Sequence, residues 1–257
     1  SVINNCVNNG EVYPPSGRAG YSGGIIGYVA SGANVRISKS VNNGLIKTSS
    51  YAGGIIGGSA GFVDIGYTEN KGVVAGELYS GGFVGRAEKL LDIYNSKNKG
   101  ELAGKHNGGF VGYSDTVGIV SIRASVNEAL FTVSKNFKDS TRNGGVAAIG
   151  MGEWTVEDFV NKSDISGMYA GGFFGWFRSF ESYTGGKGWV KSSFKIRNSI
   201  NEGNIGSLLD TTGYVLGGIV GTLYSSYDDY QLSDLDRNLI TNVVNKGNIY
   251  GSRKAYQ

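Results

Sequence analysis

The chain has 257 residues, of which 44 are Gly and two are Pro, and its 24 basic and 21 acidic residues give a net charge of +3. Both signs are spread along the whole length, which argues against nucleic acid or an anionic membrane as the main partner. No apolar run approaches the ~20 residues that a membrane-spanning helix needs, so membrane insertion is not expected. Cys6 is the only cysteine, so no internal disulfide can form, and we expect its thiol to be buried.

One short sequence unit recurs along the chain. It opens with Asn-x-Gly-x and an apolar residue, and it closes with Gly-Gly, two apolar residues and, in most copies, another Gly. In the regular copies the opening Asn recurs every 28 residues, from Asn42 to Asn70 to Asn98. A fixed period of this length is typical of a solenoid, in which each unit buries its apolar face by stacking on its neighbours. Scarce Pro and the lack of a 3.6-residue apolar stripe indicate strands rather than helices.

We therefore predict an all-β fold, a parallel β-helix (β-solenoid) of about seven to eight coils of roughly 28 residues, with longer loop insertions in the later coils. Each coil is expected to contain three short strands and three corners. Residues 1–257 are predicted to form a single β-solenoid repeat domain. We expect this domain to continue in a longer array or to associate head to tail in a filament, because a bare solenoid end exposes unpaired backbone groups.

Within a coil, the first expected strand precedes the Asn, as in residues 93–97. The Gly of Asn-x-Gly suits a left-handed backbone conformation at the following corner. Next comes a single apolar position, and then a bend leads to Gly-Gly and the apolar pair, such as Ile55-Ile56 or Phe83-Val84. Stacking of coils at roughly 4.8 Å places these apolar residues in columns inside the solenoid.

The opening Asn is present in every copy of the unit. A row of ligands for an ion or a sugar is one interpretation. The other, which we favour, is a structural ladder in which each side-chain amide bonds to the next along the axis, because a ligand site does not need one residue in every coil. The predicted ladder residues are Asn8, Asn42, Asn70, Asn98, Asn127, Asn161, Asn201 and Asn245.

Two long insertions interrupt the later repeats. The distance to the next Asn of the ladder lengthens to 26 residues after Gly175 and to 24 after Gly221. Because both insertions leave the same corner of neighbouring coils, we expect them to protrude side by side, as insertions on a binding face do.

The aromatic residues of these insertions suit recognition of a sugar or a protein, because flat rings give contact area at low entropic cost. The alternative is that they fold back as a small core on the solenoid flank. The candidate ligand-binding residues are Trp176, Phe177, Phe180, Tyr183, Trp189, Tyr224, Tyr227 and Tyr230. Calcium binding by the acidic group Asp228, Asp229, Asp234 and Asp236 is left open, since its spacing matches no EF-hand or calcium-roll pattern. No cofactor and no metal site are predicted.

Catalytic patterns are sparse. His106 is the only histidine and lies in a turn-like sequence, so the spacings that zinc sites and catalytic triads need are missing. Enzymes that cleave sugars rely on pairs of carboxylates. Only Asp64 and Asp92 share a repeat phase, whereas Asp115 does not. We predict no catalytic residue and no enzyme activity, with a carbohydrate-active β-helix (a polysaccharide lyase or hydrolase) as the alternative.

Units such as residues 41–57, with Asn42-Asn43-Gly44 at one end and Gly53-Gly54 near the other, resemble GLUG-type repeats. Such repeats occur in large surface and secreted proteins of bacteria, and the resemblance covers essentially the whole chain. It implies a β-helical stalk or adhesin region that is extracellular or on the cell surface. It implies a structural or adhesive scaffold that presents a binding edge to a glycan or a host or cell-surface protein, and it carries over no catalytic residue.

Overall fold

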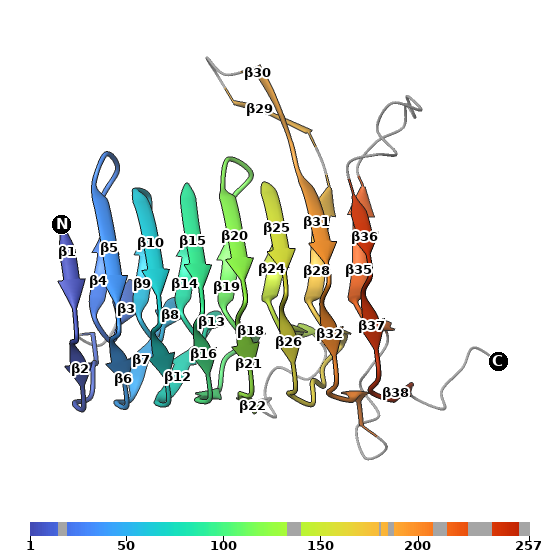
Figure 1. The fold of residues 1–257 in the computed structure, drawn as a ribbon, viewed down its shortest axis with the longest axis horizontal. Helices are drawn as coiled ribbons and strands as arrows, with labels where there is room; N and C mark the ends of the chain where they lie inside the picture. Colours follow the sequence, from blue (N-terminus) through green and yellow to red (C-terminus); the bar gives the residue numbers. More distant parts are fainter. Residues whose placement is uncertain are drawn as a thin grey trace.

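The computed structural model describes residues 1–14, 20–132, 140–179, 181–184, 188–207, 215–225 and 238–251, with the backbone alone at residues 179, 181–184, 188–191 and 225. Over these residues the chain is all-β, and its strands stack in parallel from coil to coil as the predicted β-solenoid. Figure 1 shows the coils following one another along the long axis, from the first coil at one side to the last at the other.

Each complete coil contributes strands to five sheets, which we name sheets A to E, so the prediction of three strands per coil is wrong. The extra strands arise because short bends divide what the sequence reads as continuous segments. Sheet A contains β1 (Val2–Asn4), β5 (Asn34–Ser38), β10 (Phe62–Gly66), β15 (Leu90–Tyr94), β20 (Ile119–Arg123), β25 (Glu153–Glu157), β31 (Ser193–Arg197) and β36 (Leu239–Thr241). Sheet B contains β2 (Val7–Asn8), β6 (Val41–Asn42), β11 (Glu69–Asn70), β16 (Lys97–Asn98), β21 (Val126–Asn127), β26 (Val160–Asn161), β32 (Ile200–Asn201) and β37 (Val244–Asn245).

The other three sheets complete the coils. Sheet C contains β7 (Ile46–Thr48), β12 (Val73–Gly76), β17 (Glu101–Leu102) and β22 (Leu130–Phe131), and the pair β33 (Ile205–Gly206) and β38 (Ile249–Tyr250) follows in the later coils. Sheet D contains β3 (Tyr21–Gly23), β8 (Tyr51–Gly53), β13 (Tyr79–Gly81), β18 (His106–Gly108), β23 (Arg142–Gly144), β27 (Tyr169–Gly171) and β34 (Val215–Gly217). Sheet E contains β4 (Ile26–Val29), β9 (Ile56–Ser59), β14 (Val84–Ala87), β19 (Val111–Ser114), β24 (Ala147–Gly150), β28 (Phe174–Ser179) and β35 (Val220–Ser225).

The core consists of the predicted apolar columns. The apolar pairs after Gly-Gly pack against the inward residues of sheet A, and Ile55, Ile56, Phe83 and Val84 are all fully buried. The rings of Phe83 and Phe110, in successive coils, stack with centroids 4.6 Å apart. A second, smaller cluster holds the single apolar position after Asn-x-Gly. Like residues therefore pack on like residues, as stacking of the repeats requires.

The asparagine side chains form one continuous hydrogen-bonded column. The Nδ2 of each Asn donates to the Oδ1 of the next, over distances from 2.6 to 3.3 Å, through seven consecutive bonds from Asn8 to Asn245. The six inner members, from Asn42 to Asn201, are fully buried. A buried amide needs partners for both its oxygen and its nitrogen, and this column supplies them in every coil.

The left-handed residue of each coil lies elsewhere than predicted. Within the described residues, positive φ angles in the repeat fall three positions before the Asn, for example at Tyr67 (φ 54°) and Asn95 (φ 47°), and the Gly of Asn-x-Gly is not among them. That Gly is required by stacking instead, because a Cβ on Gly44 or Gly72 would overlap the carbonyl oxygen of the equivalent Gly in the preceding coil.

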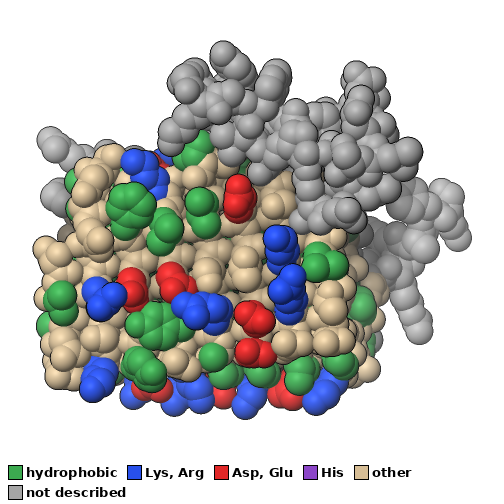
Figure 2. Space-filling model, turned by 45° about the horizontal axis from the view of Figure 1, so that its top comes forward, with side chains coloured by type: hydrophobic (Ala, Val, Ile, Leu, Met, Phe, Trp, Pro, Cys, Tyr) green, Lys and Arg blue, Asp and Glu red, His purple; other side chains and the backbone are tan. Residues whose placement is uncertain are grey.

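Polar groups cover the outer face of sheets A and B. Figure 2 shows Lys and Arg side chains interspersed with Asp and Glu over this side of the molecule. Arg36 bonds to Asp64 at 3.1 Å, Arg123 bonds to Asp92 at 2.6 Å, and Glu69 is paired with Lys99 in the next coil. The ion pairs thus join successive coils along the axis. Cys6, in the first coil, is half-buried rather than buried, because a neighbouring coil covers it on one side only.

The two insertions leave the same corner of the solenoid. The first separates β28 from β31 and the second separates β35 from β36, and these strands pair with one another in sheets E and A. In the first insertion, β29 (Glu181–Thr184) and β30 (Gly188–Lys191) form an antiparallel hairpin that extends beyond the edge of the coils in Figure 1. The common corner agrees with the sequence-based prediction.

Candidate functional site

A row of aromatic side chains runs along the outside of sheet D. The residue that precedes the buried small residue and Gly-Gly points outward in each coil and stacks on its equivalent in the next. Tyr21 and Tyr51 lie 5.3 Å apart between ring centroids, Tyr51 and Tyr79 lie 5.2 Å apart, and His106 follows 5.0 Å from Tyr79. The same register continues through Arg142 and on to Tyr169.

A second outward row, on sheet E, converges on the first. The turn between the two strands is tight, since a Cβ on Gly57 or Gly85 would overlap the backbone of a sheet D strand. Side chains of the two rows therefore touch: Tyr113 lies 5.2 Å from Tyr79, and Trp176 lies 5.1 Å from Tyr169. We call this continuous surface the aromatic strip, which comprises Tyr21, Tyr28, Tyr51, Tyr79, Arg86, His106, Tyr113, Arg142, Tyr169, Trp176 and Tyr224.

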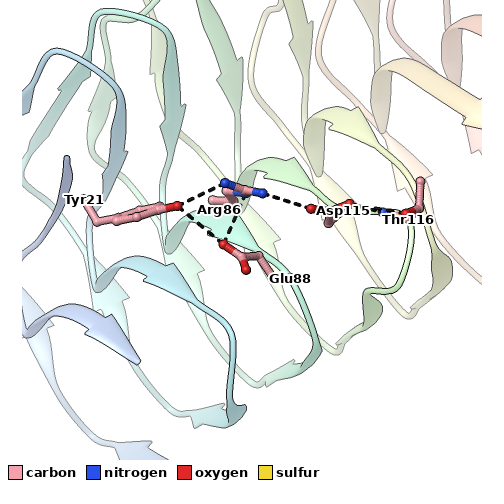
Figure 3. Close-up of polar contacts among 5 residues, drawn as sticks. All are labelled: Tyr21, Arg86, Glu88, Asp115 and Thr116. Carbon is pink, nitrogen blue, oxygen red and sulfur yellow. Dashed lines mark hydrogen bonds and ion pairs between the residues drawn. The ribbon is translucent and has the colours of Figure 1, made fainter. Parts of the chain in front are cut away.

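At one end of the aromatic strip a guanidinium is fully engaged. Arg86 donates to Asp115 at 2.9 Å and to the hydroxyl of Tyr21 at 3.0 Å, and it pairs with Glu88 at 3.4 Å, as Figure 3 shows. Thr116 donates to the same Asp115 from its backbone N–H at 2.7 Å. Burial lowers the pKa of Arg86, but the bond to Asp115 and the charge of Glu88 outweigh it, so the net shift is upward. This arginine organises its neighbours and is neutralised by them.

At the other end the strip contains a guanidinium in different surroundings. The Cζ of Arg142 lies 3.9 Å from the ring centroid of Trp176 and 5.4 Å from that of Tyr169. Its backbone N–H donates to Nδ1 of His106 at 3.2 Å, and its Nη1 lies 3.4 Å from Nε2 of the same ring. Burial lowers the pKa of Arg142, with Arg178 acting in the same direction and the Tyr79 and Tyr169 hydroxyls opposing it.

His106 is a buried strand residue and not the turn residue that its sequence suggested, with an exposed fraction of 4% in β18. Desolvation, together with the charges of Arg142 and Lys105, lowers the pKa of His106 to about 3. The imidazole is therefore neutral at ordinary pH. Burial also raises the pKa of Tyr113 to about 12, with Asp115 contributing, so its phenol stays protonated and can donate a hydrogen bond.

The predicted ligand-binding residues separate into three groups. Trp176 and Tyr224 lie on the aromatic strip, with centroids 6.2 Å apart, and the Tyr224 side chain is exposed. Phe177 was wrongly predicted as a surface residue: its ring is fully buried in the core, because side chains alternate in and out along β28. Phe180, Tyr227 and Tyr230 lie outside the described residues, as do the four Asp of the calcium hypothesis, and the side chains of Tyr183 and Trp189 lie outside them too.

Most of the aromatic strip escaped the sequence-based prediction. The signal was present as Tyr-Ser/Ala-Gly-Gly at Tyr21, Tyr51, Tyr79 and Tyr169. Since the small residue before Gly-Gly points inward, the Tyr before it must point outward. One Tyr per coil is unremarkable, and only stacking turns it into a surface.

The described residues contain no group of three or more His, Cys, Asp or Glu side chains arranged to hold a metal ion. Nor do they include any helix of the length and apolarity that crossing a bilayer requires. Comparison with known proteins gave no match to a family model, to a curated protein or to a solved structure. The argument for function therefore rests on the aromatic strip.

Proposed function

We propose that this chain is a non-catalytic β-solenoid scaffold of the cell surface or extracellular space, and that it binds a glycan chain along the aromatic strip. The observation that carries the proposal is the coil-by-coil repetition of outward rings, with centroids 5.0 to 5.3 Å apart from Tyr21 to His106. A ligand that itself repeats along one direction meets the same ring face in each coil. Tyr and Trp suit such a ligand because they combine a rigid apolar face with a polar group.

The surface location in this proposal comes from the resemblance of the units to GLUG-type repeats. The choice of a glycan rather than a host or cell-surface protein comes from the strip itself, which is long, narrow and regular. Protein interfaces of comparable length concentrate their binding energy in a central cluster of anchors. A regular row of equivalent rings fits a polymer of equivalent units better.

Polysaccharide cleavage is the rival function. The carboxylates nearest to the strip, Glu88 and Asp115, are both held by Arg86. A carboxyl group that protonates a leaving group must be free to carry a proton, and an ion pair with a guanidinium favours the ionised form. Binding without turnover is therefore the expected behaviour.

A glycan array followed by a degradation assay on every bound glycan tests the proposal. We expect binding without cleavage, and at least about a tenfold loss of affinity in Tyr51→Ala and in Trp176→Ala, since aromatic contacts dominate such surfaces. Tyr94→Ala is the matched control, because Tyr94 pairs with Tyr67 on sheet A, outside the strip. Equal losses in all three variants would refute the strip as the binding surface, and turnover would establish the rival function.

A further inference from the structure

Arg142 differs from the other arginines whose contacts are described. Arg36, Arg86 and Arg123 each bond to an aspartate. Among the described residues no carboxylate lies within ion-pair distance of Arg142, and the charged or polar groups that act on it are Tyr79, Tyr169 and Arg178. A half-buried positive charge without a counter-charge is costly, and proteins retain one where a ligand supplies the anion.

The neighbouring imidazole adds a second donor. A neutral histidine that accepts a hydrogen bond at Nδ1 carries its proton on Nε2. Since the backbone N–H of Arg142 donates to Nδ1 of His106, the Nε2 of His106 presents N–H toward Nη1 of Arg142, 3.4 Å away. Two donors thus face each other without an acceptor between them.

Further donors at this place lack acceptors. Nε of Arg142, Nε1 of Trp176 and Oγ1 of Thr222 are shielded from solvent and make no hydrogen bond. Trp176 and Thr222 are register neighbours on β28 and β35, and Arg142 stacks on Trp176, so the three groups belong to one small region of adjacent coils. Buried polar groups are nearly always paired, and a cluster of unpaired donors calls for an acceptor from outside.

We infer that the Arg142 end of the aromatic strip is a carboxylate subsite, and that the glycan is an acidic one, built from sugars of the uronic acid type. This inference rests on the proposed glycan-binding function. The guanidinium lies with its face against the Trp176 ring, so an anion meets its edge, and an edge of N–H groups matches the plane of a carboxylate. The sugar ring that bears the carboxylate then lies against Tyr169 and its neighbours, while the Arg86 end, already neutralised by Asp115 and Glu88, binds through its rings.

Calorimetric titration of the full chain with paired probes tests this inference. The probes are hexamers of galacturonate, mannuronate and hyaluronan, each beside its carboxyl-reduced neutral counterpart, together with a sulfated dextran hexamer. We expect at least one acidic hexamer to bind about tenfold more tightly than its neutral counterpart, because a charge-assisted bond to a guanidinium is replaced by a neutral one. That preference should shrink as salt is added.

Variants locate the subsite. Arg142→Gln should abolish the preference for the acidic hexamer and leave the neutral one bound, whereas Arg142→Lys should keep part of it, since the charge remains but the planar edge does not. Arg123→Gln is the matched control, because Arg123 also lies over a tyrosine ring, that of Tyr94, but on sheet A. Thermal unfolding of each variant checks that it is folded, and the comparison of paired probes in the unaltered chain holds whether or not Arg142→Gln folds.

The outcomes separate the two proposals. Equal binding of acidic and neutral hexamers by the unaltered chain would overturn the carboxylate subsite and leave the glycan-binding function standing. Preference for the sulfated hexamer alone would overturn the carboxylate assignment, and a preference that survives Arg142→Gln would overturn its location. No binding of any hexamer, acidic or neutral, would overturn both the subsite and the proposed function.

Discussion

Removal of one amide from the middle of the asparagine ladder tests the basis of coil stacking. Asn70 accepts a hydrogen bond from Asn42 at 2.8 Å, donates to Asn98 at 2.9 Å, and donates to the carbonyl of Gly72 at 3.4 Å. At about 1 kcal/mol for each net hydrogen bond, Asn70→Ala should lower the free energy of unfolding by about 3 kcal/mol. The partners keep other bonds, Asn42 to Gly44 and Asn98 from Gly100, so no further penalty for unpaired groups is expected.

The substitution Asn70→Asp sharpens the test, because it preserves shape but replaces the donor Nδ2 with an acceptor. The introduced carboxylate would then face the Oδ1 of Asn98 in a fully buried site, so at pH 7 this variant should be less stable than Asn70→Ala. Burial beside an acceptor raises the pKa of the introduced carboxyl in the folded state above its unfolded value of about 3.9. Its penalty is therefore present at neutral pH and is relieved as the pH falls through the folded pKa, where protonation restores a donor.

Urea denaturation followed by circular dichroism at pH 7 and pH 4 measures these differences. Asn8→Ala is the control, since Asn8 lies in the first coil, is partly exposed, and donates to the next coil through one bond to Asn42. Water can replace what it loses, and the expected cost is about 1 kcal/mol. A stability of Asn70→Asp equal to that of the unaltered chain at pH 7 would show that the ladder contributes nothing directional, and the reasoning above would fail.

Three other predictions concern the same stacking. Gly54→Ala should destabilise strongly, because its Cβ would overlap the carbonyl oxygen of Gly82, whereas Gly20→Ala has open space and should change the urea midpoint little; similar midpoints would refute close stacking at that turn. Phe110→Asp should unfold neighbouring coils together, since Phe110 packs on both Phe83 and Phe159, and an unchanged melting profile would place the core elsewhere. Because the folded pKa of His106 is about 3 against 6.5 when unfolded, stability should be complete above pH 6.5 and fall as the pH drops toward 3, by about 2 kcal/mol at pH 5, and His106→Gln should lack this component; identical pH profiles would contradict it.

The fold was predictable because its determinants repeat with a fixed period. The ladder and the core columns occupy the same phase in every unit, so even irregular copies such as the one at Asn127 could be aligned. The number of strands per coil was not predictable, because bends at Gly and at polar residues carry no distinct signal within 28 residues. The left-handed position was missed for a similar reason: its occupants include Lys39, Tyr67 and Ala124, whose types give no sign of positive φ.

The candidate site was harder to predict, because it exists only between coils. Trp176 and Tyr224 were found from their place beside the insertions, and Phe177 was included with them because the inward and outward alternation of β28 was not applied. Tyr51 and Arg142 lie in short repeats without insertions, where nothing in the sequence of one unit distinguishes a surface ring from a spacer. A phase-by-phase alignment of the seven Gly-Gly units, read for outward positions, would have revealed the row.

The asparagine column also has a sense of direction. In all seven bonds the amide of the earlier coil gives its hydrogen to the later one, and none runs the other way. The amide dipoles consequently add rather than cancel, and the solenoid contains a polar filament of side chains within its wall, with oxygen leading at one extremity and nitrogen at the other. Reversal of a single amide would set oxygen against oxygen on one side and nitrogen against nitrogen on the other, so each link constrains the orientation of all the rest.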